Sequence, residues 1–138
     1  MKASELKIGN LIQWEDESND IVEVLGIGHC IDGENDLAYK ETKNNSPGLA
    51  MLSEFIPIVL TEEWLLKFGF VRDLHKISTI YGKCGHTPSG KSTGLIIYQC
   101  PNGSYSPAAY NDTHQDIVYV HQLQNLFFAL TGEELTIK

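Results

Sequence analysis

The chain has 138 residues, of which 42% are hydrophobic and 20% are charged, so it can bury a core and is not intrinsically disordered. Its 18 acidic and 10 basic side chains give a formal net charge of −8. No apolar run approaches the ~18 residues that a membrane-spanning helix needs, and the first residues lack the apolar stretch of a secretory signal, so we expect no membrane partner.

The acidic side chains are concentrated in the first part of the chain. Residues 1–60 contain four lysines and eleven acidic residues, whereas residues 61–138 contain six basic and seven acidic residues. A segment with a balance of −7 repels phosphate backbones, so nucleic acid is disfavoured as a partner, and it suits a basic surface on another protein. Residues 74–111 lack acids and contain several tyrosines, but three lysines are too few positive charges for a nucleic-acid interface.

The cysteines and carboxylates show no pattern of a metal or catalytic site. Cys30, Cys84 and Cys100 are an odd, scattered set without a C-x-x-C pair, which favours free thiols in a reducing, cytoplasmic setting. The adjacent acids at 62–63 and 133–134 diverge on a helix and form no acid–base couple. We therefore predict no metal, no cofactor and no catalytic residue, and we favour a protein that is not an enzyme.

Residues 1–60 have the pattern of a small antiparallel β-barrel, similar in size to an SH3 domain. Short runs with β-branched residues alternate with polar turns at roughly ten-residue spacing, which is typical of such barrels. The predicted strands are residues 11–14, 21–27, 37–39 and 55–60. The predicted turns and loops are residues 15–20, 32–36 and 40–48.

Residues 61–138 have the pattern of an α-β-β-α unit. A first helix is expected after Thr61 as N-cap and before Gly69, and a longer one runs from about Ile117 to Thr131, where Gly132 stops it. Between them, strands are predicted at residues 70–71, 77–81 and 95–98, with loops at 82–94 and 101–116. The predicted fold class is thus α+β, with the barrel first.

Residues 85–92, Gly-His-Thr-Pro-Ser-Gly-Lys-Ser, match the P-loop pattern G-x-x-x-x-G-K-[ST]. In a P-loop a helix follows at once, and its N-terminus binds the phosphates. Here a short β-branched run, residues 95–98, is closed by Pro101-Asn102-Gly103, which predicts a strand and a hairpin loop instead. The alternative is a nucleotide or phosphate site with four anion contacts: Gly85, Gly90, Lys91 and Ser92.

Two sets of residues are candidates for contact with a protein partner. Trp14 could anchor a peptide groove if it lies on an exposed face of the barrel, as in SH3-like modules. His121, Gln124 and Asn125 have i, i+3 and i+4 spacing, so they share one face of the last helix. We expect that polar face to meet solvent or a partner.

Three stretches of the chain carry a resemblance to a known family. They are Leu-Lys-Ile-Gly-Asn-Leu at 6–11, Leu-Thr-Glu-Glu-Trp-Leu-Leu-Lys-Phe-Gly-Phe at 60–70 and Tyr-Val-His-Gln-Leu-Gln-Asn-Leu-Phe-Phe-Ala-Leu-Thr-Gly-Glu-Glu-Leu at 119–135. In them the chain resembles a family of small uncharacterised proteins of gut Bacteroidetes and their phages or prophages. The resemblance does not extend to residues 29–54 and 71–116. The resemblance implies a phage or mobile-element origin and a shared architecture, but it implies no catalytic or binding activity.

Taken together, the sequence predicts a non-enzymatic interaction module of phage or mobile-element origin, acting in the cytoplasm. Its expected partner is a protein with a basic surface, since the first part of the chain is acidic. A small acidic domain with two aromatic-rich helices also makes a homodimer a candidate assembly.

Overall fold

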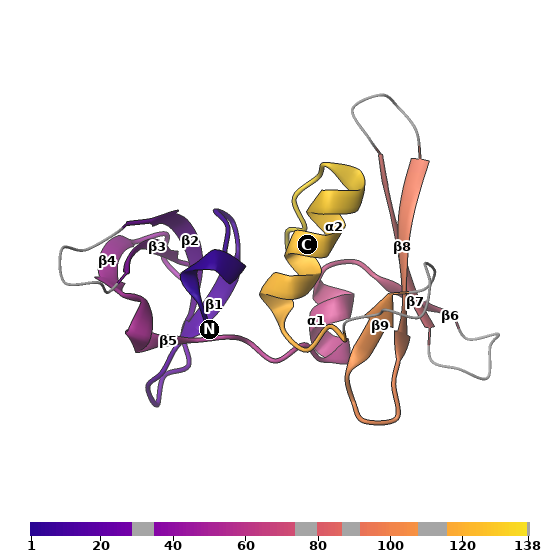
Figure 1. Ribbon diagram of the computed structural model, residues 1–138, viewed down its shortest axis with the longest axis horizontal. Helices are drawn as coiled ribbons and strands as arrows, with labels where there is room; N and C mark the ends of the chain where they lie inside the picture. The colour runs from indigo at the N-terminus through magenta and orange to yellow at the C-terminus, as the bar shows by residue number, and fades with distance from the viewer. Residues whose placement is uncertain (29–34, 74–79, 87–91, 108–115, 138) are drawn as a thin grey trace. The chain divides into compact units, whose positions relative to one another are not determined.

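The structure is a computed structural model of the whole chain and describes residues 1–28, 35–73, 80–86, 92–107 and 116–137. The chain divides into two compact units, residues 1–58 and residues 59–138, and each contains its own antiparallel sheet (Figure 1). Each unit is described by itself below.

The first unit is a strongly curled sheet of five antiparallel strands that forms a half-barrel (Figure 1). Its elements are the 3₁₀ turn η1 (Ala3–Glu5), strands β1 (Leu11–Trp14), β2 (Ile21–Ile27), β3 (Asp36–Glu41) and β4 (Pro47–Met51), the 3₁₀ turn η2 (Leu52–Glu54) and strand β5 (Phe55–Ile56). The strand order is β4-β3-β2-β1-β5, so the last strand pairs with the first. The curl is assisted by a register shift between Val24 and Gly26, which has the form of a β-bulge.

The core of the first unit lies on the concave side of this sheet. Alternate residues of three neighbouring strands, Ile12, Val22, Val24 and Leu37, have no exposed surface. This alternation follows from the two-residue period of a strand, and burying each such side chain contributes about 1.5–3 kcal/mol. The predicted strands 11–14 and 21–27 are confirmed with their predicted bounds.

Two predictions for the first unit need correction. The predicted loop 40–48 is shorter, because β3 continues to Glu41 and β4 already begins at Pro47. Proline is compatible with β4 because the strand lies at the edge of the sheet and needs no hydrogen bond from its first residue. The predicted strand 55–60 is in fact only two residues long, and Pro57 follows it directly.

The second unit packs two helices on one side of a four-stranded sheet (Figure 1). Its elements are α1 (Glu62–Lys67), β6 (Val71–Asp73), β7 (Ile80–His86), β8 (Ser92–Gln99), β9 (Tyr105–Pro107) and α2 (Val120–Thr131). The strands lie in chain order, β6-β7-β8-β9, and all pairs are antiparallel. Buried side chains of α1, β8 and α2 form the core: Trp64, Leu65, Leu95, Ile97, Val120, Leu123 and Phe127.

The first helix ends as its sequence predicts. Gly69 has a left-handed backbone (φ 79°). Its N–H donates to the carbonyl of Leu66, and the N–H of Phe70 donates to the carbonyl of Leu65, both at 2.9 Å. This pair of bonds is a Schellman motif, which satisfies carbonyls that the helix itself leaves open. Thr61 occupies the N-cap position but makes no side-chain capping bond.

The α-β-β-α prediction is too simple for the second unit. The predicted loop 101–116 contains β9, and α2 begins at Val120, three residues later than predicted. Isolated bridges pair Tyr105 with Ile117 and Val59 with Tyr119, and these hold residues 117–119 extended. Gly132 ends α2 with a left-handed backbone (φ 75°), as predicted.

Candidate functional site

A hollow of about 410 Å³ opens on the surface of the first unit. It lies where four segments of the chain meet: the first residue, the start of the β1–β2 turn, the residue before β3, and residues 52–57 of η2, β5 and the residue after it. Its lining residues are Met1, Glu15, Asn35, Leu52, Ser53, Phe55, Ile56 and Pro57. The hollow therefore combines apolar side chains with one carboxylate, one amide and one hydroxyl.

Backbone hydrogen bonds hold the walls of the hollow in place. The N–H of Leu52 donates to the carbonyl of Asn35 (2.9 Å), and the N–H of Glu15 donates to the carbonyl of Glu54 (2.9 Å). The Glu54 carboxylate in turn accepts the N–H of Met51 at 2.8 Å. These bonds tie η2 to two other segments, so the shape of the hollow exists before any ligand arrives, which lowers the cost of binding.

An aromatic cluster supports the hollow from the core side. Phe55 is 4% exposed, and its ring centroid lies 4.3 Å from that of Trp14 and 5.5 Å from that of Tyr39. Trp14 and Tyr39 meet edge to face, with centroids 5.3 Å apart and planes at 87°. Such contacts are favourable for aromatic quadrupoles and fix the ring of Phe55.

Trp14 therefore does not lie on an exposed face of the half-barrel. Its side chain is half-buried and packs against the core of the first unit. The distances place it behind Phe55, and it is absent from the lining of the hollow. Trp14 packs against Phe55, and direct contact of Trp14 with a peptide stays a prediction.

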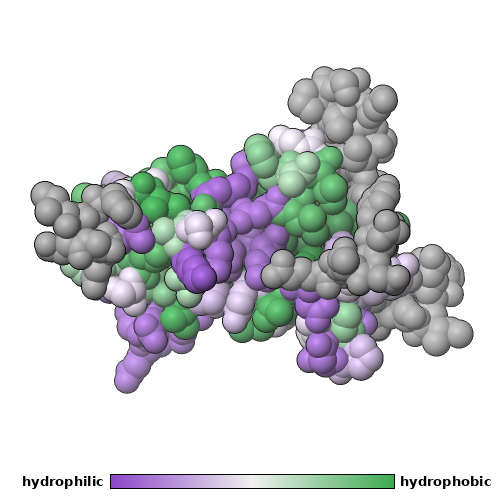
Figure 2. Space-filling view, viewed as in Figure 1, coloured by the Kyte–Doolittle hydropathy of each residue, from purple (hydrophilic) through white to green (hydrophobic). Residues whose placement is uncertain are grey.

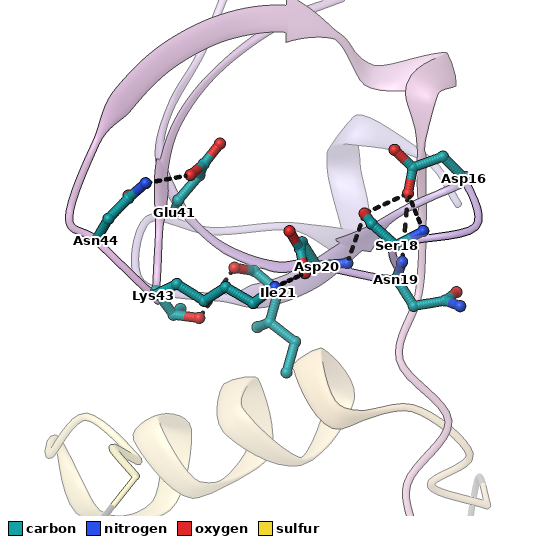
Figure 3. Close-up of polar contacts among 9 residues, drawn as sticks. Asp16, Ser18, Asn19, Asp20, Ile21, Glu41, Lys43 and Asn44 are labelled. Atoms are coloured by element: carbon teal, nitrogen blue, oxygen red, sulfur yellow. Dashed lines mark hydrogen bonds and ion pairs between the residues drawn. The ribbon is translucent and has the colours of Figure 1, made fainter.

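The β1–β2 turn carries four acidic residues, of which Glu15 lines the hollow. In Figure 2 this turn is a hydrophilic projection of the first unit. The Asp16 carboxylate is turned onto Ser18 and Asn19, and Asp20 pairs with Lys43 (Figure 3). The hydrogen bond from the Ser18 hydroxyl, assisted by backbone N–H groups, lowers the pKa of Asp16, which is therefore ionised at neutral pH.

Glu15 is the acid of this turn that lines the hollow. It is exposed, and its backbone is anchored to η2. A carboxylate beside apolar lining residues suits a lysine or arginine side chain, whose methylene stem prefers apolar contact while its charged end stays near water. The arrangement can thus hold a basic side chain, and it offers no pair of groups for acid–base or nucleophilic chemistry.

The P-loop-like segment has the predicted hairpin geometry in its described part. β7 and β8 form an antiparallel pair that extends to His86 and Ser92. Gly85 lies in β7 and Ser92 opens β8, where a P-loop would begin a helix. Gly90 and Lys91 lie outside the described residues. The prediction of a strand at 95–98 is confirmed.

The polar face predicted on α2 is largely covered. His121 is 1% exposed and Gln124 is 2% exposed, whereas Asn125 is half-buried. The Gln124 amide donates to the carbonyl of Leu135 at 3.2 Å, and Leu135 is itself buried. The expectation that His121 and Gln124 meet solvent is therefore wrong: the segment after α2 folds back onto Gln124, and the His121 ring stacks on Tyr119.

Most residues of the hollow were not identified from the sequence. Phe55, Ile56 and Pro57 were included in a predicted strand, and Leu52 and Ser53 were left unassigned. The available signal was Pro57, which limits β5 to two residues and points to a change in chain direction. Nothing in the local sequence brings Glu15 or Asn35 to the same place, because that depends on strand order.

Comparison of the chain with known protein families, curated proteins and solved structures finds no match. Within the described ranges, no helix is long and apolar enough to cross a lipid bilayer. The same part of the chain contains no group of three or more His, Cys, Asp or Glu residues placed to hold a metal ion.

Proposed function

We propose that the protein is a non-enzymatic interaction module whose first unit binds a basic side chain of a protein partner in the hollow. The observation that carries the proposal is the preformed hollow of about 410 Å³, in which Glu15 lines the same space as apolar side chains. Residues 1–58 contain eleven acidic residues and four lysines, so the unit attracts positively charged segments over a distance of several ångströms.

We further propose that the first unit is an SH3-like barrel. Two features support this: the sheet order in which β1 lies between β2 and β5, and the 3₁₀ turn η2 directly before the last strand. In small barrels of this kind, loops at one end of the sheet frame an extended peptide. The hollow lies between such connections. The resemblance of the chain's ends supports a phage or mobile-element origin, and the odd, scattered set of cysteines supports action in the cytoplasm.

The expected affinity is low. Burial of the four methylene groups of a lysine contributes ~0.8 kcal/mol each, and an exposed ion pair with Glu15 adds at most ~1 kcal/mol. Ordering the side chain costs ~0.5–1.5 kcal/mol, and association itself costs several times more. The gross gain of ~4 kcal/mol, reduced by these costs, gives a Kd weaker than ~10⁻³ M for a single anchor, and a partner with several basic residues binds more tightly.

A nuclear magnetic resonance titration tests the proposal. The probe is a short extended peptide with alternating lysines, and its counterpart carries glutamine at the same positions. We expect saturable shifts of the backbone amides of residues 52–56 and of the Trp14 indole with the lysine peptide alone. Glu15→Gln should raise Kd about two- to fivefold, the size expected for an exposed ion pair. Added salt should also raise it.

The control is Glu134→Gln in the second unit, which removes the same charge from the chain. It should change Kd much less than Glu15→Gln, because Glu15 lines the hollow and Glu134 does not. Equal effects of the two variants, or shifts without saturation, would show only general attraction to an acidic protein and would falsify the proposed site.

The alternative of a nucleotide or phosphate site draws no support from the described geometry. β8 begins at Ser92 as an antiparallel strand, so these residues supply no helix N-terminus for a phosphate. For that reason we propose the interaction module and not a nucleotide-binding protein.

A further inference from the structure

The turn between β8 and β9 contains Asn102-Gly103, the one Asn-Gly pair in the sequence (Figure 1). Both residues are exposed, and Gly103 has a left-handed backbone (φ 86°). An asparagine amide can be attacked by the backbone nitrogen of the next residue, and glycine shields that nitrogen least. Within the described residues, no atom lies within 4 Å of the position that a Cβ of Gly103 would take. This pair is therefore a candidate site of chemical modification.

Hydrogen bonds polarise the side-chain carbonyl of Asn102 for such an attack. Its Oδ1 accepts the Ser104 N–H at 3.1 Å, and the Ser104 hydroxyl lies 2.7 Å from the same oxygen. That hydroxyl also lies 2.7 Å from the Asp116 carboxylate, so two acceptors share its one proton and the backbone N–H is the constant donor. Attack on Cγ moves negative charge onto Oδ1, and donors already aimed at this oxygen stabilise that charge.

The turn restrains the attacking nitrogen only weakly. The N–H of Gly103 donates to the carbonyl of Cys100 at 3.0 Å, and the N–H of Cys100 donates to the carbonyl of Ser104 at 2.8 Å. The Gly103 nitrogen must leave its bond before it reaches Cγ of Asn102. One exposed backbone hydrogen bond favours the closed form by only about two- to tenfold, so the turn opens often without unfolding of the unit.

We propose that Asn102 deamidates spontaneously in the folded protein, and that this releases the β8–β9 turn from the segment that leads into α2. The Gly103 nitrogen bonds to Cγ of Asn102, the Cγ–Nδ2 bond breaks, and the proton of the Gly103 N–H leaves with Nδ2 as ammonia. Water then opens the five-membered imide at one of its two carbonyls. Opening at Cγ leaves aspartate. Opening at the main-chain carbonyl leaves isoaspartate, which adds a methylene group to the backbone.

The product cannot keep the contact that Asn102 makes with Asp116. The Asn102 amide donates to the Asp116 carboxylate at 3.3 Å, and deamidation replaces this donor by a carboxylate oxygen. Asp116 is ionised at neutral pH, because hydrogen bonds from Ser104 and Asn102 lower its pKa, so the two like charges repel. Next to this contact, Tyr105 and Ile117 exchange backbone hydrogen bonds of 3.1 and 2.6 Å. Repulsion at Asp116 should weaken this bridge.

Ageing of the full chain tests the modification. The protein is incubated at neutral pH and body temperature for several weeks, and peptide mapping by mass spectrometry measures aspartate and isoaspartate at each asparagine. Asn45 is the internal control, since it is exposed and is followed by Ser46. Both products should form at Asn102 at least about tenfold faster than at Asn45, because only Gly103 leaves its nitrogen unshielded. An Asn102 that stays intact, or that changes only after unfolding in urea, would overturn the proposal.

Asn102→Asp copies one product and tests its consequence. It should speed hydrogen exchange of the Tyr105 and Ile117 amides about three- to tenfold, the size expected when one exposed hydrogen bond is lost. The matched control is Asn45→Asp, which adds the same charge to an exposed turn of the first unit and should leave these amides unchanged. Melting temperatures show that both variants fold. Equal exchange in the two variants would refute the release of the turn, and it would leave the peptide proposal untouched.

Discussion

Gly48 determines how the aromatic cluster behind the hollow can pack. A Cβ atom at this position would lie 2.4 Å from the ring of Tyr39, well inside van der Waals contact. The ring therefore rests on the bare backbone of β4 while it makes the T-shaped contact with Trp14. The absence of a side chain at a single residue thus lets Tyr39 support Trp14 and Phe55.

Gly48→Ala should destabilise the first unit. The added methyl group forces the Tyr39 ring away, and through it the contacts with Trp14 and Phe55, at a cost of about 1–3 kcal/mol. Urea denaturation followed by tryptophan fluorescence measures the loss. Gly26→Ala is the matched control, since its nearest contact, the Cβ of Ala38, is at an ordinary 3.7 Å. Equal stability of the two variants would contradict this account of Gly48.

Asp116 is a residue whose effect should depend on pH. Its carboxylate accepts hydrogen bonds from the Ser104 hydroxyl (2.7 Å) and the Asn102 amide (3.3 Å), and these bonds, Ser104 first, lower its pKa. A lowered folded-state pKa contributes stability above the unfolded pKa, and this contribution is lost as pH falls through the folded value. These hydrogen bonds connect the turn between β8 and β9 to the segment that leads into α2.

Asp116→Asn should therefore lower the melting temperature at neutral pH. The difference from the wild-type protein should shrink from about pH 4 downward, because the wild-type carboxylate then becomes protonated as well. Differential scanning calorimetry across this range measures it. A difference that stays constant with pH would show that packing or shape, and not the charged hydrogen bonds, explains the effect.

At the scale of elements, the edge strand β4 is protected against pairing with another chain. Its register with β3 turns the backbone groups of Pro47, Leu49 and Met51 toward the free edge. Pro47 has no N–H, and the N–H of Met51 is bonded to the Glu54 carboxylate. Of these three residues, Leu49 alone presents an N–H there without a bond within the sheet. Such edges resist aggregation.

Glu54→Ala should increase aggregation. The change leaves the Met51 N–H open at the edge and removes a negative charge from it, so other chains can pair with β4 more easily. Light scattering during incubation at elevated temperature measures the rate. The matched control is Glu17→Ala, which removes an exposed acid from the β1–β2 turn. If both variants aggregate at the wild-type rate, the carboxylate does not protect this edge.

Elements with a strong local signal could be predicted from the sequence, and those that depend on distant partners could not. Both helices were predicted from apolar spacing and from the glycines that end them, and β1 and β2 from β-branched runs. β4 was missed because Pro47-Gly48 has the composition of a turn. β9 was missed because Tyr105 is held extended by its bridge to Ile117, which the local sequence does not encode.

The candidate site follows the same division. The acidic character of the first unit and the strand after the P-loop-like octapeptide were visible in the sequence. The hollow was not, because Glu15, Asn35 and Phe55 meet only through the pairing of β1 with β5 and the bond from Leu52 to Asn35. His121 and Gln124 were misjudged because helical spacing identifies a face but not the segment that covers it.

At the scale of the whole molecule, charge separates the two units. The first carries nearly all of the net charge of −8 and contains the hollow, whereas the second is close to neutral. Electrostatic attraction of a basic partner is thus assigned to the first unit.

The position of Glu54 also has a consequence for how this protein can change over generations. The Glu54 carboxylate accepts the Met51 N–H next to the hollow and so closes the free edge of β4. A substitution of Glu54 that changes binding in the hollow therefore also opens this edge to pairing with other chains, which favours fibrils. Substitutions of Glu15 or Ser53 can change which partners bind in the hollow, and they leave the edge of β4 closed. Diversity among variants selected for new partners should therefore accumulate at those two positions and spare Glu54.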